Sequence, residues 1–182
     1  SLSSTIPRHL LQNVESIYIG IFKELQDRNI QAMYENSSIF ITNKQKNEED
    51  MLADLIHETG HSVEEIYREI LYSDQKLESE FIRKRKEMWQ ELKDESLETS
   101  LGYFLNPDYN KEFDEYLYKQ VGYPMLSVIT TNLYYSPYAS TSLREYFANG
   151  FEAFFLKGAP SRLKNISPVL YEKLIILLNK KD

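Results

Sequence analysis

Residues 47–72, NEEDMLADLIHETGHSVEEIYREILY, decide the fold that the sequence predicts. Asn47 is a favourable N-cap, and the three acidic residues after it complement the positive end of a helix dipole. Apolar residues then recur at the spacing of one helix face, at Met51, Leu52, Leu55, Ile56, Val63, Ile66 and Ile70. The pattern predicts a helix from about Asn47 to Tyr72, with two histidines one turn apart near its middle.

The centre of this helix, His57-Glu58-Thr59-Gly60-His61, has the HExxH pattern. Residues four apart share one face of a helix, so both imidazoles can reach one ion. A catalytic zinc ion takes three protein ligands and leaves a position for water, and Glu58 is placed to act as general base on that water. We therefore expect His57 and His61 to bind Zn²⁺. The alternative is a pair of hydrogen-bonded core histidines.

The sequence offers no further histidine as a third ligand after His61. His9 lies upstream, at a predicted helix start, where we expect a surface or capping role. The longer histidine-containing signature of metzincins is therefore missing. A carboxylate is the expected third ligand.

Glu145 is the acidic residue that position favours as this ligand. It lies in a predicted helix, residues 141–155, that is almost wholly apolar or aromatic, where a carboxylate needs a charged partner or a metal. Asn149 and Glu152 follow it on the same helix face, so this polar stripe can line a site. A surface stripe or an ion pair with Arg144 is the alternative interpretation.

The remaining pattern predicts a predominantly α-helical α+β fold with a small β-sheet or hairpin beside the HExxH helix. The other predicted elements are helices from Ile6 to Arg28, Asp74 to Leu97, Phe113 to Val121 and Ser167 to Asn179, a strand from Ile39 to Thr42, and a mostly irregular stretch from Gly122 to Ser140. We expect residues 1–182 to form a single domain. The first residue is Ser1, from which we expect the segment to be excised from a longer chain.

Composition excludes several classes of protein. The chain has no cysteine, which rules out disulfides, thiol catalysis and cysteine-ligated metals. Its formal net charge of −7 would repel a nucleic-acid backbone, so we expect no nucleic-acid partner. The longest apolar run is far shorter than the roughly 20 residues of a membrane helix, so we expect no membrane span. Nothing in the sequence indicates the oligomeric state.

The motifs together resemble a known family. His57 to His61, followed by Arg144-Glu145-Tyr146-Phe147-Ala148 and the aromatic residues Phe151 to Phe155, is similar to the catalytic domain of the anthrax lethal factor family and to the related secreted Pro-Pro endopeptidases of clostridia. The resemblance implies a zincin-like zinc metallopeptidase with His57, His61 and Glu145 as ligands, Glu58 as base and a protein or peptide as substrate. It also implies a secreted or virion-associated protein.

The same resemblance suggests one further catalytic residue, and at one position this sequence differs from the family pattern. A tyrosine seven residues before the glutamate ligand assists the transition state in that family, which implies this role for Tyr138; an ordinary packing tyrosine is the alternative. Four residues after the ligand the family commonly has a second acid, and here Asn149 takes its place. Because such an acid supports a metal ligand, we expect weaker metal binding or slower turnover here.

Two more segments have a functional and a structural interpretation. Zinc peptidases generally hold an extended substrate along an edge strand beside the active-site helix. Ile39, Phe40 and Ile41 are the candidates for this substrate-binding strand, and a purely structural hairpin strand is the alternative. The basic run Arg83-Lys84-Arg85-Lys86 is interpreted as the solvated face of an amphipathic helix, and a patch for an acidic partner is the alternative.

Two rival functions remain on the sequence alone. The first is a zincin-fold binding or structural module of a toxin or virion protein that has lost turnover, which Asn149 favours and the intact Glu58 disfavours. The second is a metal-independent helical interaction domain in which HExxH is accidental.

Overall fold

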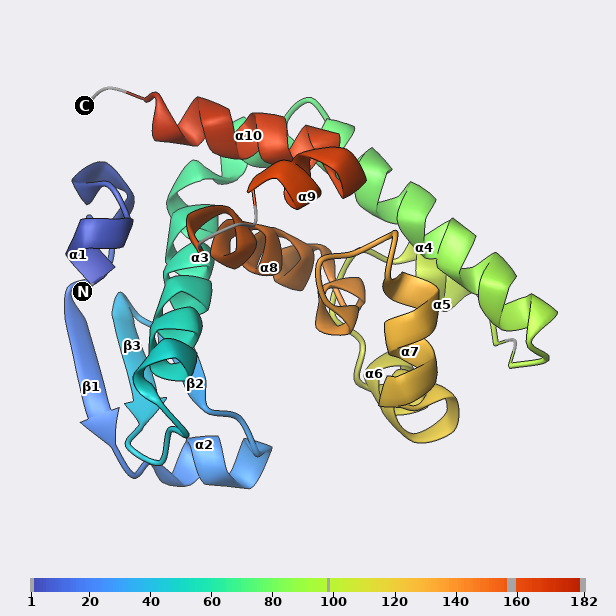
Figure 1. The fold of residues 1–182 in the computed structure, drawn as a ribbon, viewed down its shortest axis with the longest axis horizontal. Helices are drawn as coiled ribbons and strands as arrows, with labels where there is room; N and C mark the ends of the chain where they lie inside the picture. Colours follow the sequence, from blue (N-terminus) through green and yellow to red (C-terminus); the bar gives the residue numbers. More distant parts are fainter. Residues whose placement is uncertain (1, 98, 157–159, 181–182) are drawn as a thin grey trace.

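The computed structural model describes residues 2–97, 99–156 and 160–180. It is predominantly helical with one small sheet, which confirms the α+β prediction at this level (Figure 1). The helices are α1 (Leu2–Thr5), α2 (Lys23–Arg28), α3 (Glu48–Tyr72), α4 (Lys76–Asp94), α5 (Leu101–Leu105), α6 (Lys111–Tyr116), α7 (Tyr123–Thr130), α8 (Leu143–Phe155), α9 (Pro160–Ile166) and α10 (Pro168–Leu178), with short turns η1 (Arg8–Leu10), η2 (Leu117–Val121) and η3 (Pro137–Ser140). The strands are β1 (Ser16–Gly20), β2 (Ala32–Glu35) and β3 (Ser38–Thr42).

The sheet has the order β1-β3-β2, with β1 parallel to β3 and β2 antiparallel to it. A tight turn joins β2 to β3. Both strands contact α3, and the side chains of Ile39 and Ile41 are fully buried. One face of the sheet therefore rests on the HExxH helix, as the sequence predicts.

The position of β3 within the sheet corrects the prediction for Ile39, Phe40 and Ile41. We expected these residues to form an edge strand that could bind an extended substrate. Instead β3 is the central strand, and its backbone is paired with β1 on one side and β2 on the other. A strand paired on both sides has no free backbone groups for a peptide.

The predicted helix from Ile6 to Arg28 is wrong. Residues 16–20 form strand β1 instead, between the short helical segments η1 and α2. Their sequence, Ser-Ile-Tyr-Ile-Gly, combines β-branched and aromatic residues, which favour a strand once a neighbouring strand is available. The stretch from Gly122 to Ser140, expected to be mostly irregular, contains α7 and η3.

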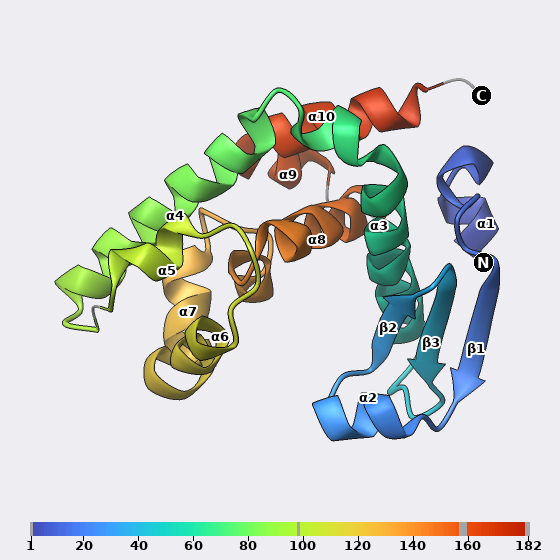
Figure 2. The same cartoon turned by 180° about the vertical axis from the view of Figure 1, so that it is seen from behind.

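The predicted helices that carry the motifs are confirmed. The side chain of Asn47 accepts a hydrogen bond from the Asp50 backbone and begins α3, and Ser142 begins α8 in the same way through Glu145. The two helices lie side by side, and α8 crosses the middle of α3 (Figures 1 and 2). Phe147 and Phe151 on α8 are fully buried in the core.

The basic run on α4 is only partly solvated, which corrects another prediction. Arg83 and Lys86 are exposed, but Lys84 and Arg85 are buried. The Lys84 ammonium donates hydrogen bonds to the backbone carbonyls of Leu133 and Ile166. Lys84 thus ties α4 to two distant segments of the chain.

Replacing Lys84 with Met should therefore destabilise the fold, because the two carbonyls that face the buried Lys84 side chain lose their donor. We expect a loss of about 2–4 kcal/mol in the free energy of unfolding, since an unsatisfied buried polar group costs about 1–3 kcal/mol. Lys86→Met, at an exposed position of the same helix, is the matched control and should change it by less than about 0.5 kcal/mol. Urea denaturation measures both, and equal stability of the two variants would contradict this role of Lys84.

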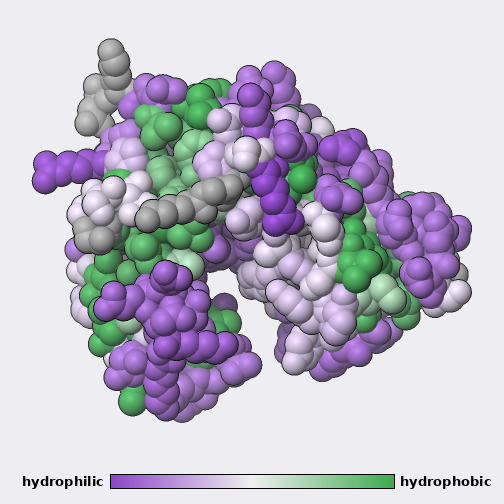
Figure 3. Space-filling view, viewed as in Figure 1, coloured by the Kyte–Doolittle hydropathy of each residue, from purple (hydrophilic) through white to green (hydrophobic). Residues whose placement is uncertain are grey.

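Two lobes flank the α3–α8 pair. The sheet and α2 form one lobe and α5, α6 and α7 form the other, with α8 between them (Figures 1 and 2). The space-filling view shows a deep notch in the surface between these lobes (Figure 3).

Over the described residues, none of the helices combines the length and apolar character that crossing a membrane requires.

Candidate metal centre

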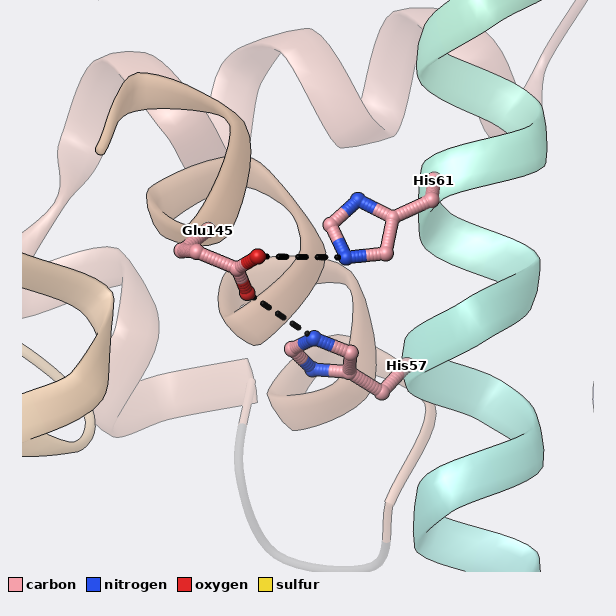
Figure 4. Close-up of side chains that lie close together, drawn as sticks. All are labelled: His57, His61 and Glu145. Carbon is pink, nitrogen blue, oxygen red and sulfur yellow. Dashed lines mark hydrogen bonds and ion pairs between the residues drawn. The ribbon is translucent and has the colours of Figure 1, made fainter. Parts of the chain in front are cut away.

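Three side chains from two helices converge at the α3–α8 crossing. His57 and His61 project from α3, and Glu145 projects from the first turn of α8 toward both rings (Figure 4). The Ser142 hydroxyl accepts the Glu145 backbone N–H at 3.1 Å and so fixes where α8 begins. The three residues that the sequence predicted as metal ligands are thus brought together from positions almost ninety residues apart.

The separations between the polar atoms fit a zinc site. The Nε2 atom of His57 lies 3.1 Å from Glu145 Oε2, and the Nε2 atom of His61 lies 3.5 Å from Glu145 Oε1. Tetrahedral bonds of about 2.0–2.1 Å would place ligand atoms roughly 3.4 Å apart. One ligand atom from each residue lies within 4.8 Å of the others. Two imidazoles and one carboxylate are also a donor set that zinc enzymes use.

Close packing of the two helices depends on Gly60. A Cβ atom built on Gly60 would lie 3.1 Å from the Cα atom of Ala148 and 3.3 Å from the Cβ atom of Phe151. Both are α8 atoms close to the backbone, so they cannot move without shifting α8. Gly60 therefore allows α8 to approach α3 closely enough for Glu145 to reach the histidines.

We expect Gly60→Ala to lower the free energy of unfolding by about 1–3 kcal/mol, the usual cost of overpacking. The matched control is Gly102→Ala in α5, where a Cβ atom would meet only the Ser100 hydroxyl, at 3.4 Å. That substitution should be neutral or stabilising by up to about 1 kcal/mol, because Ala favours helices over Gly. Thermal unfolding of both metal-free variants tests the difference. A Gly60→Ala protein as stable as Gly102→Ala would show that the approach of α8 is not tight.

Burial and charge set the protonation of the three candidate ligands in the metal-free chain. Burial disfavours protonated His57, but hydrogen bonds to Glu145 and Glu152 outweigh it and raise its pKa to about 10. Burial lowers the pKa of His61 to about 3. Burial also opposes ionisation of Glu145, yet the hydrogen bond from His57 and the nearby histidines hold its pKa below its usual range. The site is therefore built around an anionic Glu145.

Glu58 lies beside this group and is buried, with 8% of its surface exposed. Burial raises its pKa to about 7, against the attraction of His57 and a hydrogen bond with the Tyr34 backbone. Tyr34 belongs to β2, the antiparallel edge strand of the sheet. The edge strand beside the predicted base is thus β2, one strand away from the one that the sequence suggested.

Tyr138, the predicted transition-state tyrosine, lies on η3 and is 44% exposed. Partial burial of its hydroxyl raises its pKa, as do the charges of Glu145 and Glu58. η3 packs against α8, the helix that carries Glu145. Tyr138 shares no direct hydrogen bond with either carboxylate among the contacts of the described residues.

The sequence did not predict what faces the second nitrogen of each histidine. The Nδ1 atom of His57 lies 3.3 Å from Glu152 Oε2. The Nδ1 atom of His61 instead accepts a hydrogen bond from Arg144 Nε at 3.1 Å. Arg144 therefore contacts His61 rather than forming a hydrogen-bonded pair with Glu145, which the sequence allowed as an alternative. A neutral His61 in this metal-free arrangement carries its proton on Nε2, so a metal at Nε2 requires that this proton leave and that the hydrogen bond from Arg144 break.

His9 is the third histidine and takes no part in the group. Its ring nitrogen Nε2 lies 2.9 Å from the Leu177 carbonyl oxygen at the end of α10. This hydrogen bond joins the N-terminal segment to the last helix, so His9 is a half-buried tertiary contact rather than the surface or capping residue expected at a helix start.

Comparisons of the chain with protein-family models, with curated proteins and with solved structures found no match.

Proposed function

We propose that this chain is a zinc-dependent endopeptidase with a zincin-like fold that resembles the lethal factor family. The observation that carries the proposal is the convergence of His57, His61 and Glu145 at the crossing of α3 and α8. HExxH on a helix, a glutamate from a second helix and a sheet against the first helix are the features that the resemblance implies. His57, His61 and Glu145 would hold the zinc ion.

The chain's own residues can perform the proton transfers of peptide hydrolysis. When bound, the zinc ion supplies Lewis-acid chemistry, which activates water and polarises the peptide carbonyl. The Glu58 carboxylate accepts the proton of the attacking water and passes it to the departing nitrogen. The Tyr138 hydroxyl donates a hydrogen bond to the oxyanion that forms at the carbonyl.

We place the substrate along β2 rather than β3. The free edge of β2 can pair with an extended peptide, and the contact between its Tyr34 backbone and Glu58 puts that edge next to the base. The notch between the two lobes offers the space for such a peptide (Figure 3). A protein or peptide segment without secondary structure is the substrate that this arrangement fits.

A catalytically weak or inactive binding module with the same fold is the second candidate function. The feature that favours it is Asn149, an amide at the position where the family has an acid. Its side-chain oxygen accepts a hydrogen bond from Ser136 at 2.6 Å, so it is engaged in packing rather than directed at a histidine.

Metal content and peptide cleavage together test the proposal. We expect the protein dialysed against zinc-containing buffer to retain one zinc ion per chain in elemental analysis. It should cleave members of a mixed peptide library, as detected by mass spectrometry, and a chelator should stop cleavage until zinc is restored. A metal-free protein would contradict both functions, and a zinc-bound protein that cleaves nothing would favour the binding module.

A further inference from the structure

We propose that Glu152 is a positioning residue, whose carboxylate holds the His57 ring in the orientation and tautomer that metal binding needs. This inference rests on the proposed zinc site. It assigns a task to the second acidic residue of α8, which the sequence suggested only as part of a polar stripe.

The His57 ring lies between two carboxylates of the same helix. Its Nε2 atom faces Glu145 at 3.1 Å and its Nδ1 atom faces Glu152 at 3.3 Å. The two glutamates are seven residues apart, which is two turns or about 10 Å along the helix axis. They therefore approach opposite nitrogens of the ring.

This arrangement assigns a different task to each nitrogen. A histidine that donates its Nδ1–H to a carboxylate keeps the Nε2 lone pair for a metal, and the hydrogen bond also fixes the plane of the ring. Glu145, on the Nε2 side, is then left as a ligand. Glu152, on the Nδ1 side, can act only through His57.

Other polar residues near His57 are engaged elsewhere. Asn149, four residues after Glu145, accepts its hydrogen bond from Ser136. Asp54 is close enough to influence His57 electrostatically, but its carboxylate accepts a hydrogen bond from Gln45 at 2.8 Å. Among the described contacts, Glu152 is the carboxylate that bonds to the Nδ1 atom of His57.

His61 lacks an equivalent carboxylate partner in its described contacts. Its Nδ1 atom faces the Arg144 guanidinium, which cannot accept a proton. Of the two histidines, His57 is therefore the one whose Nδ1 atom is held by a carboxylate. For this reason, removing Glu152 should affect metal binding measurably.

The test compares zinc affinities, measured by competition with a chelator, for Glu152→Ala, Glu152→Gln and Asp54→Asn in the full chain. We expect Glu152→Ala to weaken zinc binding by about 10- to 100-fold, the range found for such supporting partners. Glu152→Gln retains an acceptor oxygen and should fall between this variant and the wild type. Asp54→Asn also removes one negative charge near His57 but leaves the hydrogen bond between His57 and Glu152 intact. The zinc affinity of this variant should therefore fall no more than about threefold.

A spectroscopic measurement separates positioning from a general loss of packing. In the zinc-loaded wild type, nitrogen-15 NMR should show His57 with its proton on Nδ1, protected from exchange with water. That signal should exchange rapidly in Glu152→Ala and persist in Asp54→Asn. If Glu152→Ala does not fold, the Glu152→Gln affinity and spectrum decide the question.

Two negative results can be told apart. If the wild type binds no zinc, the proposed function fails and this inference fails with it. If the wild type binds zinc and both Glu152 variants bind it no less tightly than Asp54→Asn, only the role of Glu152 is contradicted.

Discussion

The Glu58→Gln protein should bind zinc with the affinity of the wild type and cleave peptides about 10²- to 10⁴-fold more slowly, the usual contribution of a general base. Glu58 lies beside the proposed ligands His57, His61 and Glu145 but is not one of them. The amide keeps the size of the side chain but cannot take a proton from water. Chelator competition and initial cleavage rates on one peptide measure the two effects separately.

Glu69→Gln is the matched control for this experiment. Glu69 is an exposed acid on the same helix, α3, and removing its charge should leave both zinc binding and cleavage unchanged. Wild-type turnover in Glu58→Gln would contradict the general-base assignment. Loss of zinc from that variant would instead show that Glu58 helps to hold the metal.

Removal of Glu145 should have the largest effect on metal binding. We expect Glu145→Ala to weaken zinc affinity more than about 100-fold, because losing a direct ligand exceeds the 10- to 100-fold effect of a supporting partner. Loss of the carboxylate would leave two histidines of one helix, a much weaker site for zinc. Chelator competition gives the affinity, and Glu69→Gln again serves as control.

The comparison with Glu152→Ala makes this result specific. Both glutamates contact His57, but Glu145 lies on the Nε2 side and also reaches His61. A larger loss of affinity from Glu152→Ala than from Glu145→Ala would exchange the two roles and move the third ligand two turns along α8.

The sequence predicted the elements whose local signals agree with their tertiary surroundings. The helices α3 and α8 each begin at a side chain that caps the first turn, and each has an apolar face that the core then buries. The HExxH spacing fixes the relation between His57 and His61 because both lie in the regular part of α3, before the kink at Tyr67. Glu145 could be selected because an acid in an otherwise apolar helix needs a partner.

The parts that the sequence did not predict depend on contacts between distant segments. Residues 16–20 form a strand because β3 lies alongside them, although their apolar spacing also fits a helix. The sequence identifies Ile39 to Ile41 as a strand, but strand order is a property of the whole sheet, so β3 could not be distinguished from an edge. The burial of Lys84 likewise depends on carbonyls 49 and 82 residues away.

The same dependence on distant contacts applies around the candidate metal site. The sequence placed Glu152 on the face of Glu145, but only the crossing of α3 and α8 decides which nitrogen of His57 it reaches. The contact between Tyr34 and Glu58 depends on how the sheet rests on α3. In both cases a residue with no recognisable motif is positioned by packing.

Anomalous diffraction at the zinc absorption edge, from crystals grown with zinc, shows whether a zinc ion binds between α3 and α8. We expect one strong peak at the crossing of α3 and α8, about 2.0–2.2 Å from the Nε2 atoms of His57 and His61 and from a Glu145 oxygen. A peak bound to other residues, or crystals with no peak between these two helices, would contradict the account.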